Sequence, residues 1–333
     1  MKKINDNYFA AVLRENDACL APLAGVSDLP FRLICLENGA DLMVTEMVSA
    51  KGLYYNNGNT KDLLLHSPQE KNTGVQIFGS DPAVMSEAVK RYLNDTPFSF
   101  LDINMGCPVR KVTSNGDGSA LLGDWKKMEA VTRAVVEAST KPVSVKIRIG
   151  LTRQSVNCVQ TAKILEDCGV SAIAVHGRTK EQMYTGNADW DKIAQVKLRV
   201  SIPVIANGDV YSVQSYKAIK AHTGCDGVMI GRGAMGNPFL FRQIASYRKT
   251  GTWEEVSSGE KLETALRHFT YLLEYKCEKN ACAEFRKQLA WYTKGMPGSA
   301  KLRGEINSIQ TKTELYTLIN SMTESFADRI EEQ

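Results

Sequence analysis

The segment 102–108, D-I-N-M-G-C-P, places a cysteine where a chain can most easily carry out proton chemistry. Cys107 stands between a glycine and a proline, directly after an apolar run, which is typical of a loop at the end of a buried strand. An ordinary thiol has a pKa of about 8.5 and is mostly protonated at neutral pH. Cys107 can therefore donate a proton or, once ionised, act as a nucleophile. The alternative is a buried structural cysteine.

Two further apolar runs carry a polar side chain whose burial is costly unless it finds a partner. Gln76 lies within the run 74–78, and Lys146 lies between Val145 and Ile147. An amide both donates and accepts hydrogen bonds, which suits the edge of a flavin or a pyrimidine, although a core glutamine satisfied by its neighbours is an equal alternative. Lys146 needs an anionic or electron-rich partner in such a strand.

The residues that follow three later runs suit a phosphate group. They are His176, Gly177, Arg178 and Thr179 after the first run, Asn207, Gly208 and Asp209 after the second, and Gly231 and Arg232 after the third. Backbone amides of glycine and an arginine side chain are the groups that bind a phosphate monoester. Each set is weak alone, but the three in succession predict a phosphorylated cofactor.

Eight short β-rich runs position these residues. They span 18–21, 42–45, 74–78, 100–103, 143–147, 172–175, 204–206 and 227–230, with helical stretches between them. Among these stretches, 83–93 follows the helix-start signal Asp81-Pro82, a second follows Asp124 and runs to about residue 139, and a third spans 154–168. Continuously apolar runs are typical of parallel strands buried on both faces. Eight strands that alternate with helices predict an α/β protein, a (β/α)8 TIM barrel, whose active site lies at the carboxyl ends of the strands. A doubly wound sheet is the alternative, but it requires a G-x-G-x-x-G fingerprint after the first strand, where this chain has P-L-A-G at 22–25.

From about residue 245 the strand-like runs stop, and 259–277, 281–294 and 311–329 show helical periodicity. We therefore expect a barrel domain over residues 1–245 and a small all-helical domain over 246–333. The segment 285–304 contains five basic residues and no acidic one, namely Arg286, Lys287, Lys294, Lys301 and Arg303, with Trp291 and Tyr292 among them. Basic and aromatic side chains together suit RNA, although a solvated helix face is the alternative.

Composition sets the class of protein. The 333 residues carry a net charge of +4, too small by itself to indicate nucleic acid, and 43% of them are hydrophobic, as in a soluble globular protein. The eight cysteines form no C-x-x-C pair, so no metal site is expected, and scattered thiols favour a reducing compartment. No segment has the length of a membrane span or the pattern of a signal peptide. We expect a cytoplasmic protein and, because no exposed heptad seam is visible, a monomer.

In order along the chain, the motifs resemble those of the tRNA-dihydrouridine synthases, in particular the bacterial DusB-like branch. The matching segments are A-P-L-A-G-V-S-D (21–28), D-I-N-M-G-C-P (102–108), G-S-A-L-L (118–122), K-I-R (146–148), H-G-R-T (176–179), N-G-D (207–209) and G-R-G (231–233), together with Gln76. The resemblance covers essentially the whole chain. Two departures are Leu23, where methionine is common, and Asp117, which replaces a small residue.

The resemblance implies that FMN, reduced by NADPH or NADH, serves to reduce the C5=C6 bond of uridines in tRNA. It implies that Cys107 is the general acid and that Asn104 reads the uracil edge. The residues expected to bind the cofactor are Pro22, Leu23, Ala24, Gln76, Lys146, His176, Asn207, Gly208, Asp209, Gly231 and Arg232. Those expected to contact the RNA are Arg110, Lys111, Arg178, Arg286, Lys287, Trp291 and Lys294.

Two other functions remain open from the sequence. A dihydroorotate dehydrogenase-like barrel also acts on a pyrimidine C5=C6 bond, but the basic helical segment and H-G-R-T argue against it. A non-catalytic RNA-binding protein is the second, and the presence of Cys107, Lys146 and the phosphate-binding loops argues against that. The sequence does not indicate which uridine is modified.

Overall fold

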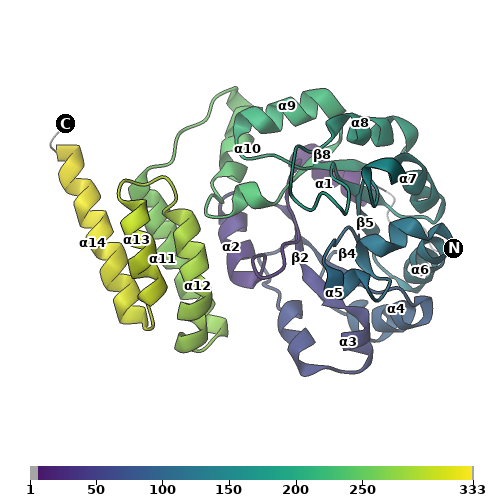
Figure 1. The fold of residues 1–333 in the computed structure, drawn as a ribbon, viewed down its shortest axis with the longest axis horizontal. Helices are drawn as coiled ribbons and strands as arrows, with labels where there is room; N and C mark the ends of the chain where they lie inside the picture. The colour runs from purple at the N-terminus through teal and green to yellow at the C-terminus, as the bar shows by residue number, and fades with distance from the viewer. Residues whose placement is uncertain (1–6, 332–333) are drawn as a thin grey trace. The chain divides into compact units, whose positions relative to one another are not determined.

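The computed structural model describes residues 7–331, and the side chains of all of these except 59, 61, 300 and 324–331. Eight parallel strands close into a barrel in the order in which they occur along the chain (Figure 1). The strands are β1 (Ala18–Leu20), β2 (Leu42–Ser49), β3 (Asn72–Phe78), β4 (Phe100–Met105), β5 (Val143–Arg148), β6 (Ala172–His176), β7 (Val204–Asn207) and β8 (Gly227–Ile230). All eight runs expected from the sequence are strands, and the predicted TIM-barrel class is confirmed.

Most strands are buried along almost their whole length because the closed sheet has a filled interior and an outer ring of helices. This explains why the sequences of β4 and β6 are apolar except at Asp102, Asn104 and His176. The register sets Gln76 beside Asp102 and Asp102 beside Ser144, on three neighbouring strands. It also sets Asn104 beside Lys146. The pairing therefore collects polar side chains from separate parts of the sequence into the interior of one barrel.

Helices return the chain between strands: α2 (Leu29–Glu37), α3 (Ala50–Tyr54), α4 (Pro82–Ala88), α6 (Trp125–Ala138), α7 (Cys158–Asp167), α8 (Trp190–Arg199) and α9 (Val213–Thr223). Side-chain caps begin several of them. Asp81, Asp124 and Asp189 each accept a hydrogen bond from a backbone N–H of the first turn. These caps confirm the helix starts at Asp81 and Asp124 that the sequence predicted.

Some elements differ from the sequence expectation. The helix expected over 83–93 continues beyond α4 as one π-helical turn (Val89–Leu93), and α7 begins four residues later than 154. Additional short elements are α1 (Tyr8–Glu15), α5 (Arg110–Thr113), α10 (Leu240–Thr250) and α13 (Ser299–Ser308), together with 3-10 turns at 58–64, 118–123, 153–155 and 232–234. The sequence did not predict these elements; α5 and the 3-10 turns are too short to carry a periodic signal.

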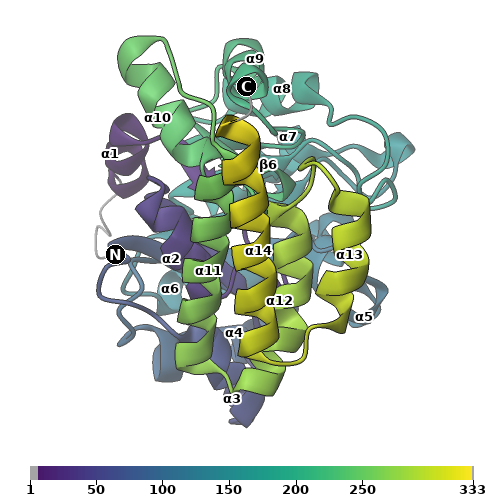
Figure 2. The same ribbon diagram turned by 90° about the vertical axis from the view of Figure 1, so that its left-hand side faces the viewer.

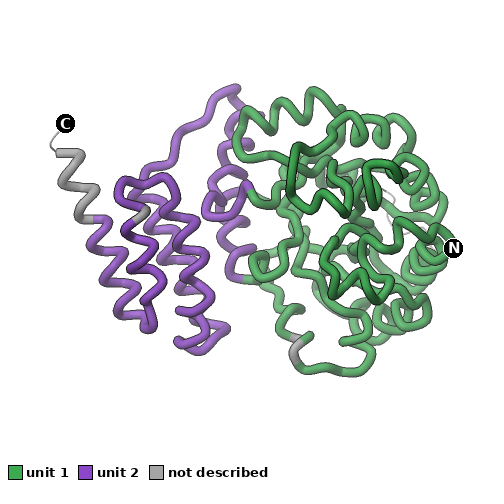
Figure 3. The backbone as a smooth tube through the Cα atoms, in the orientation of Figure 1, with its two compact units in different colours: residues 1–29, 40–232 green, residues 30–39, 233–333 purple. Residues whose placement is uncertain are grey.

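The chain divides into two compact units, residues 1–29 with 40–232, and residues 30–39 with 233–333 (Figure 3). The first unit holds all eight strands. The second unit contains α2 and α10 in addition to the C-terminal helices. The domain boundary expected after residue 245 falls inside α10, which ends at Thr250 with Gly251 in the left-handed conformation, φ 79°.

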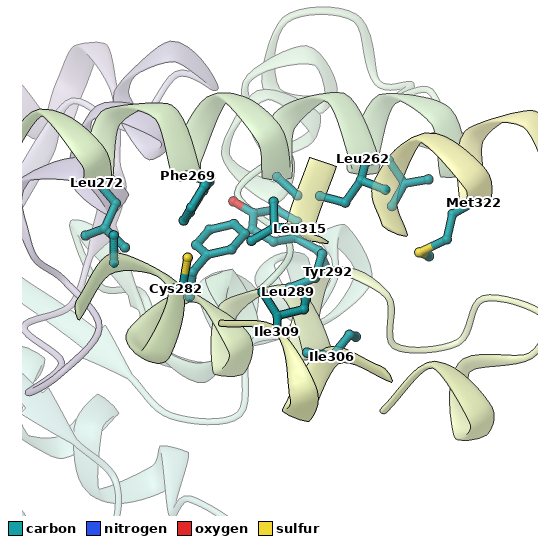
Figure 4. Close-up of a cluster of buried hydrophobic side chains, with 14 of the residues drawn as sticks. Leu262, Phe269, Leu272, Cys282, Leu289, Tyr292, Ile306, Ile309, Leu315 and Met322 are labelled. Atoms are coloured by element: carbon teal, nitrogen blue, oxygen red, sulfur yellow. The ribbon is translucent and has the colours of Figure 1, made fainter. Parts of the chain in front are cut away.

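The second unit has its own apolar core, formed by α11 (Ser258–Tyr275), α12 (Glu278–Tyr292), α13 and α14 (Lys312–Glu331), which lie side by side (Figure 2). Figure 4 shows Phe269, Leu289, Tyr292 and Leu315 pointing into the space between these helices. Within the same unit, Glu37 of α2 accepts hydrogen bonds from Arg267 and Tyr271 of α11. None of the helices in the described part of the chain is long and apolar enough to cross a bilayer.

Candidate active site at the carboxyl end of the barrel

The loop that carries Cys107, residues 106–109, is held by hydrogen bonds from both sides. The Oδ1 atom of Asn104 accepts from the backbone N–H of Gly106 at 3.1 Å and of Cys107 at 2.8 Å. The carbonyl oxygen of Cys107 accepts from the backbone N–H of Ser119 at 3.1 Å and from its hydroxyl at 2.8 Å. These bonds fix the backbone of Cys107, which is half-buried.

The environment of Cys107 keeps its thiol protonated. Burial raises the pKa of the thiol above its usual value, while a hydrogen bond with the backbone of Val109 and the charges of Arg148 and Lys146 act in the opposite direction. Because the net shift is upward, the thiol carries its proton throughout the neutral range. Such a group can donate a proton to a carbanion-like atom but is a poor nucleophile.

Asn104 is itself held by a chain of buried side chains in the barrel. Its Nδ2 atom donates to Oε1 of Gln76 at 2.7 Å, and Nε2 of Gln76 donates to Oδ2 of Asp102 at 2.6 Å. The other carboxylate oxygen, Oδ1, accepts from the hydroxyl of Ser144 at 2.6 Å. Burial raises the pKa of Asp102, and the bonds from Ser144 and Gln76 oppose this rise. Gln76 is only 1% exposed. If it contacts a flavin ring, as expected from the sequence, it can do so only through the N–H hydrogen and the oxygen lone pair that these two bonds do not use.

Lys146 lies one strand further round the barrel and points at Asn207. Its Nζ atom donates to Oδ1 of Asn207 at 3.0 Å, and Nδ2 of Asn207 donates to the carbonyl oxygen of Met229 at 2.7 Å. Burial, followed by the nearby charge of Arg148, lowers the pKa of Lys146 to about 8. A lysine held at this pKa lies in a site that lacks enough negative charge and would gain from an anionic or electron-rich ligand.

Four cationic side chains surround His176 at the carboxyl end of β6. We call Lys146, Arg148, Arg178 and Arg232 the cation cluster. Burial and the charges of these four residues hold the pKa of His176 well below its usual value, so the imidazole is neutral at neutral pH. A neutral imidazole beside several cations indicates a region of positive potential, which favours binding of an anion.

Asp209 supplies a carboxylate to this cluster. It pairs with Nη2 of Arg178 at 2.8 Å and with Nη2 of Arg232 at 3.4 Å, and it also accepts from the backbone N–H of Ala188 at 2.7 Å. The guanidinium of Arg178 is 2% exposed, yet its Nη1 atom has no hydrogen-bond partner among the residues that the structure describes. A buried cationic donor without an acceptor is costly, which fits a site that receives a phosphate oxygen.

Glycine is required at the loop that follows β7. Gly208 has φ 134°, and a Cβ atom there would lie 2.6 Å from Cβ of Ala188 and 3.3 Å from His176. The next residue, Asp209, has φ 60°, in the left-handed region. The backbone amides of this loop therefore have no side chain between them and His176. Together with the unsatisfied donor of Arg178, this backbone fits the phosphate end of a mononucleotide cofactor such as FMN.

The residues after β1 provide an apolar surface. Pro22 and Leu23 are half-buried, and Ala24 is exposed. The side chain of Leu23 lies close to Gly231, since a Cβ atom at Gly231 would be 3.5 Å from Cδ2 of Leu23. The loops that follow β1 and β8 thus meet, as expected for adjacent strands. Apolar atoms at this position suit a flat ring, and leucine fills the place of the methionine that is common in the related sequences.

Tyr184 and Arg148 were not identified from the sequence. Arg148 donates from Nε to the carbonyl oxygen of Gly106 and from Nη1 to the carbonyl oxygens of Thr179 and Met183. It thereby connects the loop of Cys107 to the loop after β6. The ring of Tyr184, 50% exposed, lies under the guanidinium groups of Arg232 at 4.7 Å and Arg148 at 5.7 Å. The only sequence signal was the second charge of K-I-R, because nothing in the local pattern at 184 distinguishes Tyr184 from a surface tyrosine.

The residues expected to contact RNA have different environments. Arg110 and Lys111 are exposed on α5, directly after the loop of Cys107. Arg178 is instead buried in the cation cluster, so its burial favours a role in cofactor binding over the direct RNA contact expected from the sequence. Lys111 and Arg178 lie in the same unit, but Lys111 is exposed and Arg178 is buried.

The other four lie in the helical unit, with Arg286, Lys287 and Trp291 on α12. Lys294 is exposed just after the helix, and Nζ of Lys287 lies 5.1 Å from the ring centroid of Trp291. Arg286 is half-buried and donates from Nε to the carbonyl oxygen of Ile309 at 2.7 Å. That bond joins two helices of the unit, so Arg286 has a structural partner.

Known proteins support one family for this chain. The family model described as "Dihydrouridine synthase (Dus)" matches residues 19–331. The chain is 39% identical over 306 residues to "tRNA-dihydrouridine synthase B" of Shewanella oneidensis, covering 92% of this chain and 94% of that one. It is 40% identical over 296 residues to the protein of the same name from Vibrio parahaemolyticus, covering 89% and 92%.

Solved structures share the fold at much lower identity. A histamine dehydrogenase from Rhizobium sp. 4-9 is similar with a TM-score of 0.51 and 14% identity over 76% of this chain and 49% of that one. A 6-hydroxypseudooxynicotine amine oxidase from Pseudomonas geniculata N1 is similar with a TM-score of 0.53 and 12% identity over 75% and 50%. At these identities the likenesses show the fold alone. The sequence identity, the extent of the match and the motifs around Cys107 and His176 together show that this chain belongs to the dihydrouridine synthase (Dus) family.

Proposed function

We propose that this enzyme reduces specific uridines of tRNA to 5,6-dihydrouridine, with FMN as cofactor and NADPH or NADH as reductant. The activity named for its relatives is the starting point. The observation that carries the proposal to this chain is the protonated thiol of Cys107, held by Asn104 and Ser119 at the same end of the barrel as the cation cluster. A proton donor and an anion-binding region at the carboxyl end of one barrel are what this reaction requires.

The cation cluster and the loops around it fit FMN. Nη1 of Arg178 and the guanidinium of Arg232 would hold the phosphate, with the backbone amides of Gly208 and Gly231 beside them. Asp209 would fix the two arginines and would not contact the anion itself. Further cofactor contacts would come from Pro22, Leu23, Ala24, Gln76, Lys146, His176 and Asn207, as expected from the sequence. When bound and reduced, FMN would supply hydride chemistry at this site.

The residues of the chain direct the rest of the chemistry. When C6 accepts the hydride, negative charge develops at C5 and on the C4 oxygen of the uracil. The Sγ atom of Cys107 gives its proton to C5, which completes the saturated bond. The amide of Asn104 holds the loop of Cys107, and we propose that it would also orient the pyrimidine edge. A thiol that stays protonated at neutral pH suits this step better than a thiolate.

A target base must leave the RNA stack before it can enter the barrel, at a cost of about a few kcal/mol. Arg110 and Lys111 would contact phosphates close to the target. On the helical domain, which we assign to residues 246–333, Lys287, Trp291 and Lys294 would provide backbone contacts and a stacking surface. The barrel domain, residues 1–245, would hold the cofactor. We propose that the enzyme acts as a cytoplasmic monomer and needs no metal.

The substitution Cys107→Ala tests the acid role. The variant should keep its yellow flavin and its NADPH oxidation, because Cys107 takes no part in binding the phosphate end. Uridine reduction should fall at least about a hundredfold, since general acid catalysis contributes roughly 10²–10⁴ to a rate. Mass spectrometry of tRNA digests measures dihydrouridine directly, as a gain of two hydrogens per uridine.

Cys277→Ala is the matched control, because Cys277 is exposed and lies in the helical unit. It should leave dihydrouridine formation unchanged. Full activity of Cys107→Ala would refute the acid role. A purified protein without a flavin spectrum would favour a non-catalytic RNA-binding function, and oxidation of dihydroorotate would favour the dihydroorotate dehydrogenase-like alternative.

A further inference from the structure

Asp102 lies in the interior of the barrel, two residues before Asn104 on the same face of β4. It is 2% exposed, and both of its carboxylate oxygens are engaged by neighbouring strands. We infer that Asp102 is a positioning residue for the proposed reaction: it fixes which way the amides of Gln76 and Asn104 face, and through them the loop that holds Cys107.

The carboxylate of Asp102 sets the direction of each hydrogen bond that leads through Gln76 and Asn104 to the loop of Cys107. A carboxylate only accepts, so the group of Gln76 that faces Asp102 must be its NH2. The carbonyl oxygen of Gln76 then faces Asn104, which must present its own NH2. As a result the Oδ1 atom of Asn104 faces the N–H groups of Gly106 and Cys107. The acceptor Asp102 thus decides which atom of the Asn104 amide faces the loop of Cys107.

Reversal of this order would place like groups against each other. If the amide of Gln76 turned over, its NH2 would face the NH2 of Asn104, and Asn104 would have to turn as well. The NH2 of Asn104 would then face the two backbone N–H groups of the loop, which cannot accept. Oxygen and nitrogen ends of an amide have nearly the same shape, so packing alone does not select one orientation. A fixed acceptor does.

The geometry around Asp102 supports an ionised carboxylate as that acceptor. The two bonds, from the Ser144 hydroxyl and the Gln76 amide, are both 2.6 Å long, the range of charge-assisted hydrogen bonds. The register places Gln76, Asp102 and Ser144 side by side on β3, β4 and β5. Asn104 contacts the backbone N–H of Cys107, whereas the thiol bonds to the backbone of Val109. Asp102 therefore acts on the position of Cys107 and not as a proton relay.

A pair of substitutions of nearly equal shape tests this inference. Asp102→Asn keeps an oxygen for Gln76 and can donate its NH2 to the hydroxyl oxygen of Ser144, so the order of the chain is retained. Asp102→Leu removes the acceptor. The control is Thr132→Val, because the Thr132 hydroxyl is buried in α6 and bonds only within that helix. All variants are made in the full chain with Cys277→Ala, which removes the exposed thiol.

Two readouts are needed. The first is the rate of Cys107 alkylation by iodoacetamide as a function of pH, followed by mass spectrometry of the peptide that contains Cys107. The second is kcat and KM for dihydrouridine formation, and only this readout rests on the proposed function. If the unsubstituted enzyme forms no dihydrouridine, the alkylation profiles still decide the role of Asp102.

In Asp102→Leu we expect the alkylation midpoint to move to lower pH, because a released loop exposes the thiol. We expect kcat to fall roughly a hundredfold, as for a reacting group displaced by about 1 Å, with KM for tRNA almost unchanged. Asp102→Asn and Thr132→Val should keep the original profile and kcat. An unchanged profile in Asp102→Leu, or equal losses in Asp102→Asn and Asp102→Leu, would overturn the inference.

Ser144→Ala keeps the inference testable if the leucine variant does not fold. It removes the hydroxyl that holds Oδ1 of Asp102, and with it one of the two bonds that orient the carboxylate toward Gln76. Loss of one hydrogen bond to a charged group should lower kcat by up to about tenfold and move the alkylation midpoint in the same direction. A profile and kcat identical to those of the parent protein would then contradict the inference.

Discussion

The loop of Cys107 and the cation cluster lie at the same end of the barrel but are built in opposite ways. Around Cys107, the side chains of Ser144, Asp102, Gln76 and Asn104 are linked in series, and each of their polar atoms has a hydrogen-bond partner. In the cation cluster, two of the four positive side chains, Arg178 and Arg232, pair with the carboxylate of Asp209, and Nη1 of Arg178 has no partner among the described residues. One region is complete within the protein, whereas the other is complete only with an anion.

This difference separates two tasks. A proton donor must be placed accurately before the substrate arrives, so its supports are satisfied internally and the thiol is neutral. A cofactor site gains its affinity from groups that are left unsatisfied in its absence. The pKa shifts agree, since burial raises that of Cys107 and lowers those of Lys146 and His176, and each group is thereby moved toward its neutral form.

The largest expected effect comes from removing the unsatisfied donor. Arg178→Ala should raise the Kd of FMN for the apoprotein roughly a hundredfold, because truncation of a buried charged hydrogen-bonding group costs several kcal/mol. Quenching of flavin fluorescence during titration measures this directly. Arg199→Ala is the control, since Arg199 is exposed at the last turn of α8. Equal FMN affinity in both variants would show that the cluster is not the phosphate site.

A smaller effect on FMN binding should follow when a methyl group is added to the loop after β7. Gly208→Ala must adopt a positive φ and meets Ala188, so we expect a loss of about 3 kcal/mol in the free energy of unfolding and about tenfold weaker FMN binding. Gly224 offers a comparison, since it has φ 62° with no atom close to its Cβ position.

Gly224→Ala should therefore cost only about 1 kcal/mol and leave FMN affinity unchanged. Chemical denaturation measures the loss of stability in each variant, and flavin titration measures FMN affinity. Together they distinguish backbone strain remote from the site, as in Gly224→Ala, from strain at the site, as in Gly208→Ala. If both variants lost stability equally and bound FMN equally well, the close approach of Ala188 to Gly208 would have no role in the site.

The sequence predicted the elements that have a strong local pattern. The eight strands were recognised because burial on both faces makes parallel strands read as apolar runs, and Asp81 and Asp124 mark helix starts by their capping chemistry. Cys107, Lys146 and the glycine loops were found because polar residues at the ends of such runs meet in a barrel. The resemblance of the motifs then supplied the family.

What the sequence could not predict depends on contacts between strands. Asp102 and Gln76 lie 26 positions apart, and only the register makes them neighbours. The burial of Arg178 follows from the loop of residues 183–186 closing over it, with Gly186 and Thr185 accepting its hydrogen bonds. Local periodicity carries no signal for either feature, so the sequence predicted neither the contacts of Asp102 nor the burial of Arg178.

The smallest expected effect is a pH dependence that distinguishes the two regions. Lys146, with a pKa of about 8, is charged below that pH and loses its charge above it. FMN affinity of the apoprotein should therefore be constant near neutral pH and weaken roughly fourfold between pH 7 and 8.5, as the proton is lost from one group. The phosphate of FMN is already a dianion over this range, so it does not contribute.

Lys146→Met should bind FMN more weakly but with no change in affinity between pH 7 and 8.5. Cys107→Ala should keep the dependence of the parent protein, because the thiol belongs to the region that does not bind the anion. Flavin titrations at several pH values compare the three proteins. The same slope in Lys146→Met as in the parent would assign the titration to another group, and a flat profile in Cys107→Ala would remove the separation between proton donor and anion site on which the comparison rests.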